Sequence, residues 1–322
     1  MKKNKSNQDR RNFLKLSAMA GAAIPLMGFD QVISKASPRI KNDIKVHLFS
    51  KHLQFLNFND MSEVAAEMGF DGIDLTVRPG GHVLPERATQ DLPKAVAAMK
   101  NFGLSPVMMT TNITSAKDPI LIKVLETASQ ENLKYYRMGW LDYPDDKTLD
   151  QSITAFSDQF KALEKLNKKL GLQGGYQNHA GNHMGSPIWD LAQILEGCSH
   201  PWIGSQYDIR HATVEGINSW ELGLRRIHPY INTIVIKDFK WGEVDGKWML
   251  INTPLGEGMV DFNRYFSLLK KYEVNVPVSL HLEYDLGGAE HGKSELTMDK
   301  NKVFEQMKKD LKFLRETWAN TQ

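Results

Sequence analysis

Cysteine is nearly absent from the sequence, because the chain of 322 residues contains only Cys198. A single cysteine forms no intramolecular disulfide and no thiolate metal cluster, and it neither supports nor opposes an oxidising compartment. Extreme composition is absent too, since 41% of the residues are hydrophobic and 24% are charged. These values are close to the average of soluble globular proteins. They exclude an intrinsically disordered chain and a disulfide-stapled miniprotein, and they allow a large core.

A strong positive charge is missing from most of the chain. The formal net charge is +2, but residues 1–36 carry seven Lys and Arg against two Asp, a net of +5. The remaining 286 residues therefore carry a net charge of −3. A mildly acidic body lacks the basic surface that binding to a phosphate backbone requires. We therefore exclude nucleic acid as the main ligand.

The apolar run near the N-terminus is too short to span a membrane. It extends over Leu16–Phe29, 14 residues where a bilayer requires about 20, and it is rich in Ala and Gly. Arg10 and Arg11 precede it, and Ser34-Lys35-Ala36 follows with the small residues of a cleavage site. We interpret this segment as a twin-arginine signal peptide. The twin-arginine export machinery would carry the protein to the periplasm, and cleavage near Ala36 would leave no membrane anchor.

The rest of the chain alternates between short β-branched or apolar runs and longer helical patterns. Eight runs of each kind follow in strict alternation, which predicts a parallel sheet with crossover helices. The length and the lack of a linker favour one α/β domain over residues 37–322, a single (β/α)8 TIM barrel. The predicted strands are 44–50, 71–77, 105–111, 134–140, 172–178, 202–208, 231–238 and 276–283, and the predicted helices are 60–68, 91–102, 119–131, 148–170, 187–196, 219–227, 261–272 and 301–318.

Local sequence signals support the helix boundaries. Gly69, Gly103 and Gly171 each follow a helical pattern and precede an apolar residue and a strand, as expected where the backbone turns left-handed. Asp118-Pro119 and Ser186-Pro187 each place a capping side chain before a proline at the first helical position. The local and global patterns therefore predict the same fold.

In a (β/α)8 barrel the active site forms at the carboxyl ends of the strands. Polar side chains gather at these ends, whereas the strand interiors are rich in Val, Ile and Leu. The sequence therefore predicts a polar pocket at this end of the barrel. Its candidate residues are His82, Arg137, Trp140, Gln177, His179, Asp208, Arg210, His211, Lys237 and Glu283.

Four of these residues form a candidate metal site. Asp208, Glu283, His179 and His211 follow three different strands and offer oxygen and imidazole ligands without sulfur. Such a mixed set suits Mn, Mg, Co or Zn, with open positions for a bidentate substrate. The alternative is a hydrogen-bonded ion-pair network that only stabilises the rim, in which Asp208 pairs with Arg210.

Short motifs over residues 44–318 resemble those of the sugar phosphate isomerase/epimerase family, the xylose-isomerase-like TIM barrels. They are Gly72-Ile73-Asp74-Leu75, Asn178-His179, Asp208-x-x-His211, Lys237-Asp238, Gly256-Glu257-Gly258-Met259-Val260-Asp261 and Leu282-Glu283. The resemblance implies a divalent metal held by carboxylates at strands 5, 6 and 8 and a His at strand 7. It implies that Asp208 and Glu283 are ligands and that His211 binds substrate or metal.

Two positions depart from the pattern of that family. Gln177 stands where many members have Glu, and Val235 stands where many have His. Gln offers a coordinating oxygen but accepts no proton, and Val does neither. An exchange of protons between two carboxylates on opposite faces of a substrate carbon is therefore disfavoured, and His179 and His211 are the natural replacements.

Residues 240–252 form an insertion after strand 7. Asp245-Gly246 is a strong signal for a two-residue hairpin, with Trp241 and Trp248 on its arms. Exposed indole rings are unfavourable, so the hairpin either packs on the rim or offers an indole face to a sugar ring.

The expected activity is that of a divalent-metal-dependent isomerase or epimerase of an unphosphorylated sugar or keto-sugar. A base would remove an α-proton and the metal would stabilise the enediolate. Glu283, His179 or His211 is the expected base, and Lys237 would polarise an oxygen or pair with Asp238. Substrate contacts are expected from His82, Arg137, Trp140, Gln177, Arg210 and Trp241.

Two other functions stay open. A lyase or hydratase would use the same enolate to expel a β-substituent, such as a glycosidic oxygen, from a keto-sugar. A barrel that binds carbohydrate without chemistry is the other alternative, and Gln177 and Val235 are the residues that suggest it. The sequence names neither the sugar nor the metal, and it leaves open a homo-oligomer.

Overall fold

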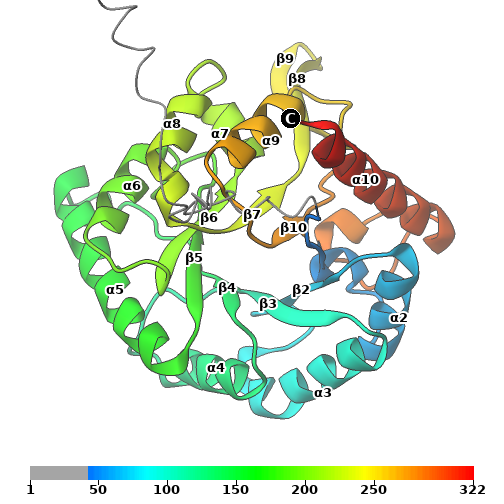
Figure 1. Ribbon diagram of the computed structural model, residues 1–322, viewed down its shortest axis with the longest axis horizontal. Helices are drawn as coiled ribbons and strands as arrows, with labels where there is room; N and C mark the ends of the chain where they lie inside the picture. Colours follow the sequence, from blue (N-terminus) through cyan, green and yellow to red (C-terminus); the bar gives the residue numbers. More distant parts are fainter. Residues whose placement is uncertain (1–42) are drawn as a thin grey trace, which may run out of the picture. The chain divides into compact units, whose positions relative to one another are not determined.

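The computed structural model describes residues 43–322, and the predicted signal peptide lies outside them. Eight parallel strands close into a barrel in the order β1-β10-β7-β6-β5-β4-β3-β2, with helices in a ring around it (Figure 1). The predicted (β/α)8 barrel is thereby confirmed. Its strands are β1 (Val46–Phe49), β2 (Gly72–Val77), β3 (Ser105–Thr111), β4 (Tyr135–Arg137), β5 (Gln173–Gln177), β6 (Ile203–Asp208), β7 (Ile231–Ile236) and β10 (Val278–Leu280).

Every predicted helix overlaps an observed one. Among residues 43–322 one α-helix was not predicted. It is α7, which starts directly after β6 without a loop, and its seven residues are too few to show a helical period. The α-helices are α2 (Phe58–Met68), α3 (Ala88–Asn101), α4 (Pro119–Gln130), α5 (Leu149–Leu170), α6 (Ile188–Glu196), α7 (Ile209–Glu215), α8 (Trp220–Ile227), α9 (Phe262–Lys271) and α10 (Lys300–Asn320). Short 3-10 turns are η1 (Ser50–Leu53), η2 (Pro85–Arg87), η3 (His228–Tyr230) and η4 (Ala289–His291).

The predicted glycine turns and the Asp118 cap are confirmed, whereas the cap predicted for α6 is not. Gly69, Gly103 and Gly171 have φ of 92°, 75° and 71°, a left-handed conformation that side chains with a Cβ rarely adopt. Asp118 caps α4 by accepting hydrogen bonds from the N–H groups of the first turn. The predicted Ser186 cap is wrong, because its hydroxyl donates instead to the carbonyl of Gly181, 2.7 Å away.

Polar groups fill part of the barrel interior beneath the strand ends. Asp74 of β2 is fully buried and accepts hydrogen bonds from the hydroxyls of Thr110 (3.0 Å) and Ser279 (2.6 Å). Burial raises the pKa of this carboxyl, although the two hydroxyls oppose the shift. The apolar core lies instead between strands and helices, where Trp318 of α10 packs edge-on against Phe266 of α9.

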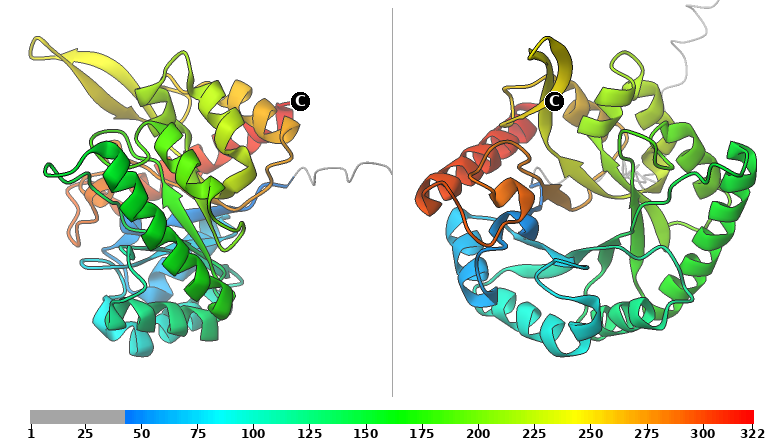
Figure 2. Two further views of the ribbon diagram at one scale, coloured as in Figure 1. Left: turned by 90° about the vertical axis from the view of Figure 1, so that its left-hand side faces the viewer. Right: turned by 180° about the vertical axis from the view of Figure 1, so that it is seen from behind.

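The insertion after β7 is a hairpin of β8 (Asp238–Val244) and β9 (Lys247–Thr253). Asp245 and Gly246 form its turn with φ of 50° and 73°, as the sequence predicted. The hairpin projects beyond the barrel (Figure 2), and Trp241 and Trp248 keep 41% and 71% of their surface exposed. Trp248 does not pack on the rim, whereas Trp241 contacts the buried ring of Phe239 edge-on at the base of the hairpin. Within residues 43–322, no helix is long and apolar enough to span a bilayer.

Candidate active site

A pocket with an empty volume of about 310 Å³ opens at the carboxyl ends of the barrel strands. This is the end at which TIM barrels perform chemistry, and the sequence predicted a polar pocket there. The pocket is lined by Phe49, Lys51, Arg78, Arg137, Trp140, Gln177, His179, Lys237, His281 and Glu283.

Four side chains from β5 to β7 form the Asp208 network, which we define as Gln177, Asp208, His211 and Lys237. The Oδ2 atom of Asp208 accepts a hydrogen bond from Gln177 Nε2 at 2.7 Å and lies 3.2 Å from Lys237 Nζ. Lys237 Nζ is also 2.8 Å from His211 Nε2. All four side chains are buried, so the ion pair is shielded from solvent. The network gives both charges a partner.

Local structure explains the two motifs that carry these residues. Asp208 ends β6 and caps α7, because its Oδ1 accepts the backbone N–H of His211 at 3.1 Å. Asn178, which follows β5, bonds to both backbone groups of Asp208. Its Oδ1 accepts the N–H of Asp208 at 2.8 Å, and its Nδ2 donates to the carbonyl of Asp208 at 3.0 Å. The spacing Asp208-x-x-His211 is therefore the geometry of a helix cap.

Arg210 positions His211 from outside the pocket lining. Its Nη1 lies 3.1 Å from His211 Nδ1, and its Nη2 donates to Asn252 Oδ1 at 2.7 Å. Asn252 donates in turn to the carbonyl of Glu283 at 3.2 Å, which joins β9 to the site. Burial, followed by the charge of Lys237, lowers the pKa of His211 well below its usual value. Both ring nitrogens face cationic donors, so His211 stays neutral.

His179 presents an unprotonated nitrogen. Its Nδ1 lies 2.8 Å from the carbonyl of Ala180, which only accepts, so Nδ1 carries the proton and Nε2 keeps its lone pair. The ring packs 3.9 Å from that of His211 and 4.6 Å from that of Trp140. Burial and the nearby Lys237 lower its pKa to about 4. His179 is therefore a neutral imidazole at physiological pH.

Glu283 lies on the opposite side of the pocket and is already paired. Its Oε2 accepts a hydrogen bond from Lys51 Nζ at 2.8 Å, and its Oε1 lies 3.6 Å from His281 Nδ1. Burial by itself raises the pKa of this carboxyl, but His281, Lys237 and Lys51 together lower it far below its usual value. Glu283 is therefore a carboxylate.

Two arginines, which we call the arginine pair, line the pocket without a carboxylate partner. Among residues 43–322, no carboxylate lies within 4.0 Å of Arg78 or Arg137. Arg78 lies over the ring of Phe49 at 5.6 Å, and Arg137 lies over Trp140 at 4.6 Å and donates to Gln177 Oε1 at 3.1 Å. Burial lowers the pKa of both groups, to about 10 for Arg137, which leaves both charged.

Comparison with known protein families agrees with this geometry. The profile of the xylose isomerase-like TIM barrels matches residues 62–317. The chain belongs to this family. No curated protein matches the sequence significantly.

Solved structures with this fold are distant in sequence. The 3-keto-D-glucoside 4-epimerase of E. coli is 15% identical with a TM-score of 0.64, covering 85% of this chain and 100% of that chain. A probable 3-DHS dehydratase of Bacillus anthracis is 15% identical with a TM-score of 0.59, covering 87% and 100%. A family protein of Mycobacterium smegmatis, solved in complex with magnesium, is 12% identical with a TM-score of 0.62, covering 86% and 97%. At these identities the likeness shows the fold.

The residues of this family member do not fit a divalent metal. Within residues 43–322, no three His, Cys, Asp or Glu side chains are arranged to hold one. Asp208 already neutralises Lys237, and the oxygen of Gln177 accepts from Arg137. Val235 is aligned with Asp208 across the strands, so an apolar group stands beside the carboxylate. The four predicted ligands therefore have different partners. Asp208 pairs with Lys237, Glu283 with Lys51, His179 bonds to the Ala180 carbonyl, and His211 lies beside Lys237 and Arg210.

Other predicted contacts also differ from the structure. Lys237 pairs with Asp208 and not with Asp238, whose carboxylate accepts four backbone N–H groups. The alternative pairing of Asp208 with Arg210 is wrong too, because Arg210 bonds to His211 and Asn252.

Some predicted substrate contacts lie outside the pocket lining. Both ring nitrogens of His82 are used, Nδ1 with the Ser50 hydroxyl at 3.1 Å and Nε2 with the Leu53 carbonyl at 3.2 Å. Trp241 lies on the projecting hairpin, whereas Arg137, Trp140 and Gln177 do line the pocket. The prediction missed Lys51 and Arg78. Arg78 directly follows β2, and Lys51 lies in η1, two residues after the end of β1, where reading the end of the first strand would have found it.

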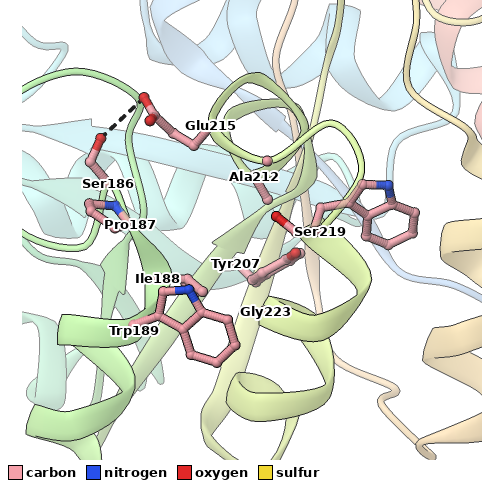
Figure 3. A pocket seen from close by; sticks show the side chains of 11 residues that line it. Ser186, Pro187, Ile188, Trp189, Tyr207, Ala212, Glu215, Ser219 and Gly223 are labelled. Carbon is pink, nitrogen blue, oxygen red and sulfur yellow. Dashed lines mark hydrogen bonds between the residues drawn. The ribbon is translucent and has the colours of Figure 1, made fainter.

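A second cavity lies apart from the pocket at the strand ends and shares no lining residue with it. It has an empty volume of about 460 Å³ and lies in the helix layer between α6, α7 and α8 (Figure 3). Tyr207 lines it, whereas the next residue, Asp208, faces the barrel interior, because successive strand residues point to opposite faces. Glu215 Oε1 lies 3.4 Å from the Ser186 hydroxyl at its edge. No predicted site residue lines this cavity.

Proposed function

We propose that this protein is a sugar isomerase or epimerase that acts on an unphosphorylated sugar or keto-sugar by α-proton abstraction. The observation that carries the proposal is His179, a neutral imidazole whose free Nε2 belongs to a pocket that Lys237 also lines. His179 would take the proton from the carbon beside a carbonyl group, and the C–H electron pair would form the enediolate. Lys237 would stabilise the developing negative charge on oxygen.

The other two predicted bases are less suited to this step. Lys51 holds one carboxylate oxygen of Glu283, and cations face both nitrogens of His211. Return of the proton from His179 to the adjacent carbon, with transfer of the hydroxyl proton between the two oxygens, would isomerise the sugar. Delivery of a proton to the opposite face by a second donor would epimerise it, and His179 would then release its own proton to solvent. A divalent metal takes no part in this proposal, because the donor set does not fit one.

Elimination is the second candidate, and Gln177 favours it. An epimerase needs a proton donor on the second face, and an amide in place of a carboxylate accepts no proton there. A lyase or hydratase needs a single base, because the enediolate then expels a β-substituent. The dehydratase among the structural neighbours is consistent with such chemistry on this fold.

The occupied backbone N–H groups after β7 support an unphosphorylated substrate. TIM barrels often bind phosphate through backbone N–H groups of the loops after strands 7 and 8. Here the N–H groups of Phe239, Gly256, Gly258 and Val260 are already bound by the carboxylate of Asp238, at 2.8 to 3.2 Å. The protein therefore fills this position with its own anion.

Proton exchange in deuterated water tests the proposal. The protein is incubated with a panel of aldo- and keto-sugars, and products and deuterium at the α-carbon are followed by NMR. We expect deuterium incorporation that His179→Ala reduces by about 100-fold or more, whereas His291→Ala, a change on an exposed turn, has no effect. A pocket that binds sugars without any exchange would indicate a binding protein, and full activity of His179→Ala would refute the assigned base.

We further propose that the protein acts in the periplasm. The paired arginines and the Ser34-Lys35-Ala36 triplet support this location. Lysine does not reproduce the guanidinium group, so Arg10→Lys with Arg11→Lys should retain the uncleaved protein in the cytoplasm. Normal periplasmic recovery of this double variant, measured by fractionation, would contradict the proposal.

A further inference from the structure

The pocket has more positive charge than its own carboxylates neutralise. Four cationic side chains line it, Lys51, Arg78, Arg137 and Lys237, against the single carboxylate of Glu283. Asp208 adds a second carboxylate behind Lys237. Lys51 and Lys237 are therefore paired. The buried carboxyl of Asp74 attracts both arginines from the barrel interior, but it bonds to the hydroxyls of Thr110 and Ser279 and forms an ion pair within 4.0 Å with neither arginine. Both guanidinium groups therefore lack an ion-pair partner. This excess lies in a chain whose residues 37–322 carry a net charge of −3.

The fully buried side-chain atoms of the lining that lack a partner are hydrogen-bond donors. Arg137 Nε and Trp140 Nε1 are buried and have no hydrogen-bond partner among residues 43–322. Arg137 is 5% exposed, and an unpaired buried cation is unfavourable unless a ligand compensates it. Donors without partners call for a ligand that is rich in acceptors, and charged donors call for an anion.

The negative charge that forms on the substrate oxygen during the proposed reaction does not explain why two arginines line the pocket. That charge develops beside His179, after β5, where Lys237 is available. Arg78 follows β2, which lies across the closed barrel from β6, and Arg137 ends β4, which lies between β2 and β6 and next to β5. Arg78 is therefore placed to bind a group of the substrate away from His179, and Arg137 lies between Arg78 and His179.

We infer that the substrate is a sugar acid, whose carboxylate is bound by Arg78 and Arg137 while its reactive carbon faces His179. Planar guanidinium groups match the two oxygens of a carboxylate. A phosphate is disfavoured because the backbone position that would bind it is filled by Asp238. The inference rests on the proposed function only in that the ligand is a carbohydrate.

Binding of matched sugars tests the inference without reference to turnover. Isothermal titration is performed with D-glucuronate against D-glucose, D-galacturonate against D-galactose, and D-mannuronate against D-mannose. Glucose 6-phosphate and glucose 6-sulfate carry other anions at the same carbon. We expect at least one uronate to bind about 10-fold or more tighter than its neutral partner and than the phosphate and sulfate esters, with an affinity that falls as salt is added.

Variants then assign the preference to the arginine pair. Arg78→Met should weaken uronate binding by about 10- to 100-fold and should weaken binding of the matched neutral sugar by a clearly smaller factor. Arg137→Lys keeps the positive charge at the more buried position but loses the planar guanidinium group that binds both carboxylate oxygens. It should weaken uronate binding by a smaller factor than Arg78→Met does. Arg87→Met is the matched control, because Arg87 pairs with Asp91 on an exposed helix, and it should bind as the unchanged protein does.

Several results would overturn the inference. They are equal binding of uronates and neutral sugars, preference for the phosphate or sulfate ester, binding of no sugar of either class, and undiminished uronate binding by a folded Arg78→Met variant. Deuterium exchange on neutral sugars alone would overturn the inference and leave the proposed function intact. Uronate binding without deuterium exchange would support the inference and contradict the proposed function.

Discussion

The Asp208 network and the arginine pair belong to one site, but they differ in whether their buried charges have an ion-pair partner. In the network, the carboxylate of Asp208 bonds to Gln177 and pairs with Lys237. In the pair, Arg78 contacts the ring of Phe49, and Arg137 reaches an aromatic ring and one neutral amide oxygen. The network is complete without a ligand, whereas the arginine pair is not. The comparison separates residues that organise the site from residues left for substrate.

The largest effect is expected from breaking the network. Asp208→Ala leaves Lys237 buried without a counter-ion, which should lower the free energy of unfolding by about 3 to 5 kcal/mol. Removing both charges with Asp208→Ala and Lys237→Met should recover much of this loss. Urea unfolding of the single and double variants measures the difference, and equal stabilities would show that the pair is not an electrostatic unit.

A buried carboxylate away from the site provides the next test. Asp310 of α10 accepts a hydrogen bond from Tyr284 at 3.0 Å but forms no ion pair within residues 43–322, and burial raises its pKa to about 7. The folded state therefore binds a proton that the unfolded state releases above about pH 4, so stability falls as pH rises from about 4 to 7. Asp310→Asn should stabilise the protein by on the order of 2 to 4 kcal/mol at pH 8.

The gain from Asp310→Asn should vanish below about pH 4, where the unfolded carboxyl is also protonated. Thermal or urea unfolding of the two proteins from pH 4 to 8 measures it. A constant difference across this range would show that the carboxyl does not titrate as described.

A measurement of Mn²⁺ binding distinguishes the observed Asp208 network from the metal site that the sequence predicted. The unchanged protein should retain less than about 0.1 equivalent of Mn²⁺ after dialysis, because Lys237 satisfies Asp208. Gln177→Glu with Val235→His would place a carboxylate and an imidazole beside Asp208 and should create a site for one ion. At 100 times its dissociation constant, the ion would then stabilise this variant by about 2.7 kcal/mol. Stoichiometric Mn²⁺ in the unchanged protein would contradict the assignment.

The smallest effect is expected at the arginine pair. Arg78 has no carboxylate partner, so Arg78→Met should change the free energy of unfolding by less than about 1 kcal/mol in the absence of ligand. Urea unfolding of this variant beside Asp208→Ala tests the contrast directly. A loss as large as that of Asp208→Ala would show that Arg78 is structural and not reserved for a ligand.

The fold was predictable because its signals are local. Left-handed glycines after helices, the Asp118 cap and the Asp245-Gly246 turn each act over a few residues, and the alternation of strands and helices repeats eight times. The direction of a parallel barrel then places every strand end at one mouth. The sequence by itself therefore determined the barrel and the end at which its polar side chains gather.

The partners of those side chains were decided only by the tertiary structure. Whether Asp208 meets a metal, Arg210 or Lys237 depends on the register between β6 and β7 and on α7, which starts at once after β6. Lys51 and Glu283 are 232 positions apart and meet only because β1 and β10 close the barrel. A one-dimensional pattern indicates which residues reach the mouth, but charge pairing depends on distances of a few ångströms, which only the packed barrel defines.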